Sequence, residues 1–482
     1  MLLQHTAIYA FGRGVPGIIN FLAIAIYTRL LTPDDYGHYA LVIAGVGLAN
    51  SVMFEWLRLG LLRFFETTGG EPRRLLATIL SGFMAGVAIA SLAVAIAVAC
   101  QPDPSWLGLV ALSLALLFAQ AWFELNLELA RVQFSPVRYS LMAACRAVAG
   151  LAVGVLLIEA GFGAVGALLG VLIALAISPL SFTGSSWRGV HPRLVDPRLL
   201  KQLLAYGLPL TASLTLNFVV SASDRFLIAW LLGSEETGVY AAGYDMIWHT
   251  LTMLMMLVHL AGYPLAVRAL EQQGVEACQR QLRQNFLLLV AIGVPAAAGI
   301  AVCAATIAGV ILGEAFRVAA VGLIPWVALG AILARFKGYY VDLSFHLGRN
   351  TLAQVWVMLA AAGLNVVLNL WLIPLHGVQG AIYATVVSYL LAFGLAVWVG
   401  RRIFPLPAPP PEALKVLAAT AVMVAVLWHT REAQGLEALL IQIALGGGSY
   451  VLGLWALDFA GLRRGLWRLL VRRRPQPGVT GG

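Results

Sequence analysis

The sequence predicts an all-α integral membrane protein of about fourteen transmembrane helices, arranged as two six-helix lobes and two additional C-terminal helices. Three observations predict this class. Hydrophobic residues make up 61% of the 482 residues and charged residues only 11%, whereas soluble domains carry about 25% charged residues. Apolar runs long enough to cross about 30 Å of hydrocarbon as helices recur along nearly the whole chain. A similar polar loop between two such runs occurs twice in the sequence.

Short polar, glycine-rich or proline-rich breaks separate the predicted spans. The first apolar run is too long for a signal peptide, and it contains Arg13 and no small-residue cleavage site, so we expect a retained span. The expected limits are 5–31, 38–64, 76–100, 106–130, 139–159, 163–183, 206–232, 238–267, 285–312, 318–346, 352–373, 377–400, 414–430 and 437–458.

The distribution of Arg and Lys predicts the orientation. Loops after odd-numbered spans hold only Arg29, Arg317 and Arg431, and the other loop and tail Arg and Lys residues follow even-numbered spans. Because cytoplasmic loops carry an excess of positive residues, both termini are predicted to be cytoplasmic. The net charge of +9 is spread over these short loops and the tail, which is typical of a topology signal and not of nucleic-acid binding.

The repeated loop reads RLLTPDDYGHYA at residues 29–40 and WLLGSEETGVYA at residues 230–241. A second repeated segment reads GFGAVGA at residues 161–167 and LHGVQGA at residues 375–381. The first repeated segment joins the first two spans of each predicted six-helix unit, and the second joins its last two spans. Since six is even, both units enter the membrane in the same orientation, which predicts a pseudo-two-fold axis along the membrane normal and a cavity between the lobes.

These signals predict five segments in order. They are an N-terminal six-helix lobe (1–184), a cytoplasmic linker (185–205), a C-terminal six-helix lobe (206–403), two additional transmembrane helices (404–462) and a basic cytoplasmic tail (463–482).

The segments YTRLLTPDDYGHYAL (27–41) and YGLPLTASLTLNFVVSASDRFLIAWLLGSEETGVYAAGYDM (206–246), with the glycine-rich turns, resemble the polysaccharide transporter family. That family belongs to the multidrug, oligosaccharidyl-lipid and polysaccharide exporters. The resemblance implies a multi-pass flippase of the bacterial inner membrane, which moves a lipid-linked oligosaccharide for lipopolysaccharide or other polysaccharide biosynthesis to the outer leaflet. In lipid-II-flipping relatives, cavity arginines are thought to hold the pyrophosphate, and two extra C-terminal helices are thought to line a groove for the lipid tail.

Charged side chains inside the spans are the candidate site residues, because each costs at least about 2.5 kcal/mol at the bilayer centre unless it is hidden or used. Arg13 is the favoured residue, since its planar, always-charged fork suits a diphosphate. The predicted substrate-binding set is Arg13, Asn20, Arg58, Arg146, Arg225 and Arg335. The predicted coupling or gating set is Asp224, Glu55, Glu124 and Asp342.

Two pairs leave alternatives open. Glu55 and Arg58 lie three residues apart on one helix face, which favours an intrahelical ion pair as much as a site. Asp224 and Arg225 could form a locked pair at the outer gate. Alternatively, Arg225 meets the substrate phosphate while Asp224 accepts a proton or sodium ion.

Two further sets are placed by helical spacing. Glu124 lies on an acidic face of span four and either pairs with an arginine such as Arg146 or acts as a coupling carboxylate. On span ten, Arg335 and Asp342 follow one face, Lys337 points elsewhere, and Asp342 is near enough to the cytoplasmic end to be wetted.

No catalytic residues, metal site or cofactor are predicted, because the sequence has no phosphate-binding lysine loop, no zinc-type motif and only scattered cysteines. The expected partners are the lipid-linked oligosaccharide, membrane lipid and possible polymerase or other envelope-glycan assembly proteins, without nucleic acid. Two rival functions are a multidrug or toxin cation exporter of the same superfamily and a non-transporting envelope-assembly scaffold.

Overall fold

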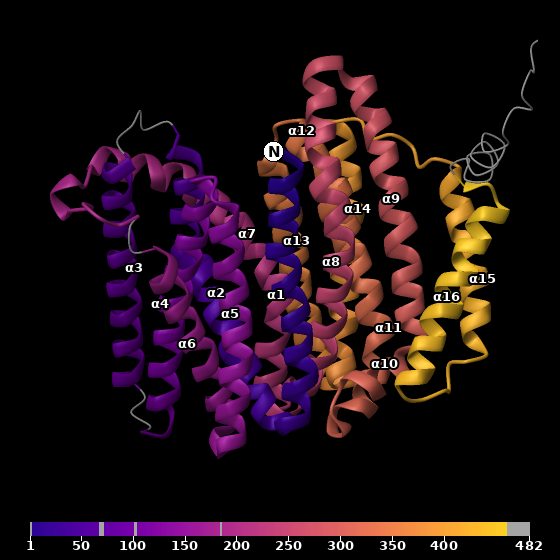
Figure 1. Cartoon of the computed structure of the whole chain (residues 1–482), viewed down its shortest axis with the longest axis horizontal. Helices are drawn as coiled ribbons and strands as arrows, with labels where there is room; N and C mark the ends of the chain where they lie inside the picture. The colour runs from indigo at the N-terminus through magenta and orange to yellow at the C-terminus, as the bar shows by residue number, and fades with distance from the viewer. Residues whose placement is uncertain (1, 67–71, 101–103, 184–185, 460–482) are drawn as a thin grey trace, which may run out of the picture. The chain divides into compact units, whose positions relative to one another are not determined.

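The structure is a computed structural model that describes residues 2–66, 72–100, 104–183 and 186–459, with side chains of the first helix described from Gly14 onward. All of its regular structure in these ranges is helical (Figure 1). The long helices are α1 (Leu2–Leu30), α2 (Pro33–Phe64), α3 (Pro72–Cys100), α4 (Pro104–Val132), α5 (Pro136–Leu157), α6 (Gly163–Thr183), α7 (Pro197–Leu231), α8 (Ser234–Gln273), α9 (Val275–Val302), α11 (Glu314–Phe336), α13 (Thr351–His376), α14 (Val378–Ile403), α15 (Glu412–Trp428) and α16 (Leu436–Ala456). The short elements are η1 (Ile158–Phe162), η2 (Pro192–Leu194), α10 (Ala304–Ile311), η3 (Lys337–Val341) and α12 (Leu343–Leu347).

Each predicted span corresponds to one long helix, so the all-helical membrane class is confirmed. Within the described residues, 11 helical runs are long and apolar enough to cross a membrane. That number counts α5 and α6 as one run of 48 residues, although the chain turns at Gly161, where φ is 92°. The described apolar part of α1 and the 17 residues of α15 are shorter.

The helix starts carry the expected capping chemistry. Thr32 caps α2 by accepting a hydrogen bond from the Asp35 amide at 3.1 Å, and Pro33 takes the first helical position. Asp34 and Asp35 then place negative charge beside the positive end of the helix dipole. These side chains end α1 and begin α2 within two residues, which fixes the position of the first copy of the repeated loop.

Both copies of the second repeated segment contain a glycine with positive φ where one helix ends and the next begins. Gly163 (φ 51°) and Gly377 (φ 60°) hold corresponding positions, and both adopt the left-handed region that favours glycine. Three residues later, a Cβ on Gly166 would lie 2.9 Å from the carbonyl carbon of Leu157, and one on Gly380 would collide with a backbone carbonyl of the preceding helix. The two copies thus share the two glycines that the close turn needs, whereas the π-helical element η1 with Gly161 precedes the turn only in the first copy.

The chain divides into two compact units. The first holds residues 1–249, 312–320 and 351–392, and the second holds residues 250–311, 321–350 and 393–482. Helices α8, α11 and α14 contribute a segment to each unit. The predicted boundaries of the lobes, linker and tail are not tested by this division and stay predictions.

The core of the first unit lies among α2, α3 and α4. Phe54, Leu57 and Ile79 are almost completely buried there. Small residues bring the helices together, since a Cβ on Gly86 would lie 2.7 Å from the Phe54 ring, and one on Gly170 would lie 2.5 Å from the Cα of Gly154. Glycines at these positions therefore allow the helices to pack closely.

The second unit packs α9 against the two C-terminal helices. Val290 of α9, Val416 of α15 and Leu454 of α16 share one buried cluster. The Tyr450 hydroxyl donates a hydrogen bond to the Ala291 carbonyl at 2.7 Å, which joins α16 to α9. Helix α9 begins at Val275, earlier than the predicted span, because its amphipathic first turns continue the helix beyond the apolar run.

The linker is packed against the first unit. The Trp187 indole donates to Asn126 Oδ1 at 2.7 Å, and its ring lies 4.9 Å from that of Trp122 on α4. The Asp196 amide donates to the Thr78 hydroxyl of α3 at 3.1 Å. The segment from Trp187 to Asp196 is thus anchored to α3 and α4.

Candidate functional site

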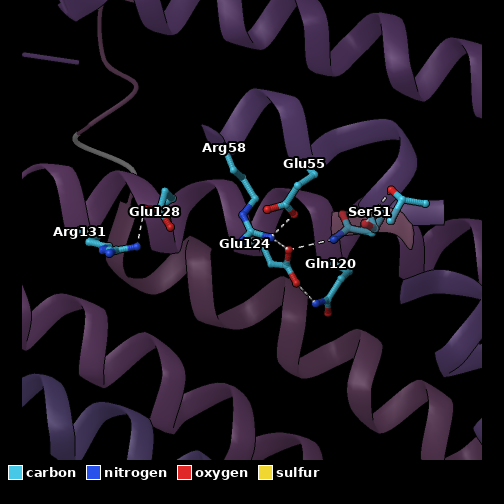
Figure 2. Close-up of polar contacts among 9 residues, drawn as sticks. Ser51, Glu55, Arg58, Gln120, Glu124, Glu128 and Arg131 are labelled. Carbon is cyan, nitrogen blue, oxygen red and sulfur yellow. Dashed lines mark hydrogen bonds and ion pairs between the residues drawn. The ribbon is translucent and has the colours of Figure 1, made fainter. Parts of the chain in front are cut away.

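The first cluster of charged side chains lies between α2 and α4 and centres on Glu124 (Figure 2). Arg58 Nη1 donates to Glu55 Oε2 at 2.8 Å and also to Glu124 Oε2. The Asn50 amide donates to the same Glu124 oxygen at 2.9 Å, and the Gln120 amide donates to Glu124 Oε1. Arg58 therefore holds two carboxylates, and the predicted intrahelical pair is part of a larger network.

Arg146 of α5 adjoins this network. Its Nη2 donates to Gln120 Oε1 at 3.3 Å, and its guanidinium lies 5.1 Å from the centre of the Phe123 ring. Since Gln120 also donates to Glu124, it connects Arg146 to that carboxylate. The structure thus brings together four of the predicted residues, Glu55, Arg58, Glu124 and Arg146. We call these four with Asn50 and Gln120 the Glu124 cluster.

The charged side chains of the cluster are partly exposed although they lie within membrane helices. Side-chain exposure is 28% for Arg58, 20% for Glu124 and 14% for Glu55. At 1.5 Å per residue, Arg58 lies about 9 Å from the C-terminal end of α2, Glu124 about 12 Å from that of α4, and Arg146 about 15 Å from the start of α5. Charged groups at such depth face a protein interior or a water-filled cavity instead of lipid. The arrangement is suited to bind a charged ligand there.

Asp224 of α7 is fully buried at 0% exposure. Its Oδ1 accepts from Asn369 Nδ2 at 2.8 Å, and its Oδ2 accepts from the Tyr240 hydroxyl at 2.7 Å and from the Thr385 hydroxyl. Asn365 donates to Thr385 at 3.3 Å and completes the network. In the described part of the chain no ion pair joins Asp224 to a basic side chain, so a buried carboxylate is held by neutral donors alone.

Arg225, the next residue, points to a different partner. Its Nη2 donates to Asp245 of α8, and its guanidinium lies 5.9 Å from the centre of the Tyr244 ring. The alternative in which Asp224 and Arg225 form a locked pair is therefore wrong. Successive residues of a helix are separated by about 100°, so adjacent side chains meet different neighbours. The other alternative for these two residues stays open.

The second unit contains Arg335 and Asp342. Arg335 lies at the end of α11, and its guanidinium is 5.7 Å from the centre of the Tyr339 ring. Asp342 is 4% exposed and accepts from Lys337 Nζ at 2.9 and 3.0 Å. The expectations that Asp342 is wetted and that Lys337 points elsewhere are wrong.

The reason is the π-helical element η3, in which the Asp342 amide donates to the Lys337 carbonyl at 2.8 Å. A π turn places residues five apart on one face, whereas an α-helix does so for residues three or four apart. The Lys337–Asp342 pair is thereby closed within one helix and neutralised.

Two predicted residues lie elsewhere. The side chain of Arg13 is outside the described residues, and its substrate role stays a prediction. Asn20 is on the exposed face of α1.

The two copies of the repeated loop lie in direct backbone contact. A Cβ on Gly37 would collide with the Ser234 carbonyl oxygen, and a Cβ on Gly238 would collide with the Pro33 carbonyl oxygen and lie 2.8 Å from the Gly37 nitrogen. The Ser234 hydroxyl also donates to Asp34 Oδ1. Only glycine allows this approach, which explains why both copies keep it at the same place. We call this arrangement the repeat-loop contact.

The start of α11 joins the repeat-loop contact. The Gly313 amide donates to the Thr28 hydroxyl at 3.1 Å, and the rings of Tyr36 and Phe316 meet edge to face at 5.6 Å. These contacts lie within the first unit.

The sequence-based site omitted the neutral partners of Asp224. Asn365 and Asn369 are four apart in the otherwise apolar stretch 355–373, so both lie on one helix face. That polar pair was a usable signal. Tyr240 matches Tyr39 in the repeated loop, and this match does not indicate a contact with Asp224.

Comparison with solved structures defines the fold class. The lipid II flippase MurJ in an inward closed conformation aligns with a TM-score of 0.76 at 11% identity, covering 94% of this chain and 99% of that chain. An inward-facing multidrug resistance MATE family transporter of the MOP superfamily aligns with a TM-score of 0.61 at 14% identity, covering 82% and 97%. A MOP superfamily transporter from Pyrococcus furiosus Vc1 aligns at 0.59 and 15%, covering 83% and 94%.

The fold is therefore that of the MOP superfamily transporters, which are multi-pass membrane proteins. The chain belongs to the polysaccharide biosynthesis protein family, whose profile matches residues 26–321. Comparison with curated protein sequences gives no match. The resemblance inferred from the loop and span motifs is confirmed at the level of family, and the fold is the one that the superfamily shares.

Proposed function

We propose that this protein is a flippase that moves a lipid-linked oligosaccharide of the polyprenyl-phosphate type from the cytoplasmic to the outer leaflet of a bacterial inner membrane by alternating access. The observation that carries the proposal is the Glu124 cluster, where an arginine with 28% side-chain exposure lies inside membrane helices. Membrane proteins keep such groups for substrate or ion pathways. A guanidinium is suited to a phosphate because it binds bidentately.

The direction follows from the predicted topology. With both termini in the cytoplasm, Arg58 and Arg146 lie in the inner half of the bilayer and Arg225 in the outer half. Inner-half arginines would recruit the phosphate group, and the lipid tail would stay in the bilayer while the sugars cross through water. Arg225 is paired with Asp245 in this structure, so it would have to exchange that partner to contact substrate.

Asp224 is the proposed coupling residue. A fully buried carboxylate with only neutral donors gains from taking up a proton or a small monovalent cation, because either cancels a charge that burial penalises. Asn369 Oδ1 is buried next to it without a hydrogen-bond partner among the described residues. That oxygen is a suitable second ligand for a cation.

The repeat-loop contact is the proposed outer gate. In the predicted topology, loops after odd-numbered spans face outward, so contact between the loop after span one and the loop after span seven would close the outer side. Opening toward the outside would then require Gly37 and Gly238 to separate.

Translocation by the purified full chain in proteoliposomes tests the proposal. The substrate is a fluorescent polyprenyl-diphosphate oligosaccharide, and arrival in the opposite leaflet is read by a membrane-impermeant quencher. We expect wild-type protein to equilibrate the label between leaflets and Arg58→Ala to slow this at least tenfold. The matched control is Arg268→Ala, which removes an exposed arginine whose hydrogen bond in the described chain is to Gln272 on its own helix.

The rivals predict different results from the same preparation. A cation exporter would move ethidium across the vesicle membrane and leave the oligosaccharide lipid in its original leaflet. A scaffold would move neither. Either result contradicts the proposed function.

A further inference from the structure

We propose that Glu124 sets the anion selectivity of its cluster, because its carboxylate occupies Arg58 until a diphosphate displaces it. The proposal deepens the proposed function and rests on it. It assigns to Glu124 the role of an internal competitor for the substrate phosphate.

The charge balance is the first support. The cluster contains two arginines, Arg58 and Arg146, and two carboxylates, Glu55 and Glu124, so its formal charge is zero. A singly charged anion that approaches Arg58 meets two carboxylates already on the same nitrogen. A diphosphate carries more charge and more acceptor oxygens, so it can replace a carboxylate that a monovalent anion cannot.

The hydrogen bonding of Arg58 is the second support. Both carboxylates take Nη1, while Nε is buried with no hydrogen-bond partner in the described chain. A guanidinium normally uses two parallel donors toward one carboxylate or phosphate. Half of the fork is thus unused in this state, and a rotation of Arg58 toward a phosphate would gain a bidentate arrangement.

The surroundings of Glu124 are the third support. When Arg58 turns away, the Asn50 amide at 2.9 Å and the Gln120 amide still donate to Glu124. The released carboxylate therefore keeps two hydrogen bonds and is not stranded in a desolvated site. Gln120 also accepts from Arg146, so the second arginine is connected to the carboxylate that the ligand displaces.

The test is titration of the purified full chain with inorganic pyrophosphate, followed by calorimetry, with inorganic monophosphate as the second ligand. We expect Glu124→Gln to bind pyrophosphate at least tenfold more tightly than wild type. Monophosphate should gain more than pyrophosphate, so the preference for pyrophosphate should fall. Glu55→Gln should act in the same direction, because it removes the other carboxylate from Arg58.

Two controls assign the effect to Arg58. Adding Arg58→Ala to Glu124→Gln should abolish the gain. Glu271→Gln removes one negative charge at an exposed position of α8 and should leave the wild-type affinities unchanged. If Glu124→Gln loses its monodisperse elution profile, Glu55→Gln decides the question by itself.

The inference is overturned if the variants bind pyrophosphate no more tightly than wild type, if no binding is measurable in any of them, or if the gain survives Arg58→Ala. Its failure is separable from failure of the proposed function. Translocation of the oligosaccharide lipid with unchanged pyrophosphate binding would reject only the role of Glu124. Tighter pyrophosphate binding without translocation would reject only the flippase.

Discussion

Asp224→Asn is expected to slow cation-driven translocation strongly while the protein stays folded. The substitution keeps the size of the side chain but removes the charge that a proton or cation would cancel. Because the described partners of the buried carboxylate are the neutral groups of Tyr240, Asn369 and Thr385, the substitution breaks no ion pair there. We expect the rate under an imposed sodium or proton gradient to fall about tenfold or more, which corresponds to ~1.4 kcal/mol.

The measurement compares translocation in proteoliposomes with and without each gradient, and thermal unfolding in sodium chloride against choline chloride and at two pH values. Wild-type protein should be stabilised by the ion that drives it, since a ligand that binds only the folded state raises stability. Asp224→Asn should lose this stabilisation, and Glu271→Gln should retain it. A variant at position 224 with the wild-type response to both gradients would show that coupling resides elsewhere.

Gly238→Val is expected to hold the repeat-loop contact apart and to stop turnover. The added Cβ would meet the Pro33 carbonyl oxygen and lie 2.8 Å from the Gly37 nitrogen, and both are backbone atoms that cannot rotate away. Overpacking of this kind costs about 1–3 kcal/mol. Applied to a two-state equilibrium, that energy shifts the ratio of closed to open forms by roughly 5- to 150-fold.

The shift can be read with a membrane-impermeant thiol reagent and a cysteine at Asp34, which is itself part of the contact. In the Gly238→Val background this cysteine should react faster and translocation should fall. Gly363→Val is the matched control, because Gly363 is an exposed glycine of α13 in the same unit with open space around it. Equal reactivity and undiminished translocation in Gly238→Val would argue that the contact does not open during transport.

Helix number and the turn chemistry could be predicted from the sequence because their causes are local. Apolar length sets the spans, and glycines with positive φ, such as Gly163 and Gly377, set the tight turns. The repeated loop could also be identified from sequence. Its role as a contact between its own two copies could not, because that depends on how distant helices approach each other.

The partner of each intramembrane charge was the least predictable feature. Arg58 pairs with Glu55 three residues away, as helical spacing suggests, but its second carboxylate comes from α4. Lys337 and Asp342 required a π turn that their sequence does not signal. Asp224 and Arg225 are adjacent in sequence yet serve separate networks. Helical periodicity predicts on which face of its helix a residue lies, and tertiary packing determines which side chains contact that face.

The central claim is that the repeat-loop contact must open and close for lipid-linked oligosaccharide to cross. The most direct measurement uses the double variant Asp34→Cys and Ser234→Cys, which replaces the hydrogen-bonded pair across the contact, joined by a short, reducible bifunctional thiol reagent in proteoliposomes. We expect translocation to stop when the two thiols are linked and to return when the link is reduced, with each single cysteine variant unaffected by the reagent. Continued translocation by the linked protein would contradict the account.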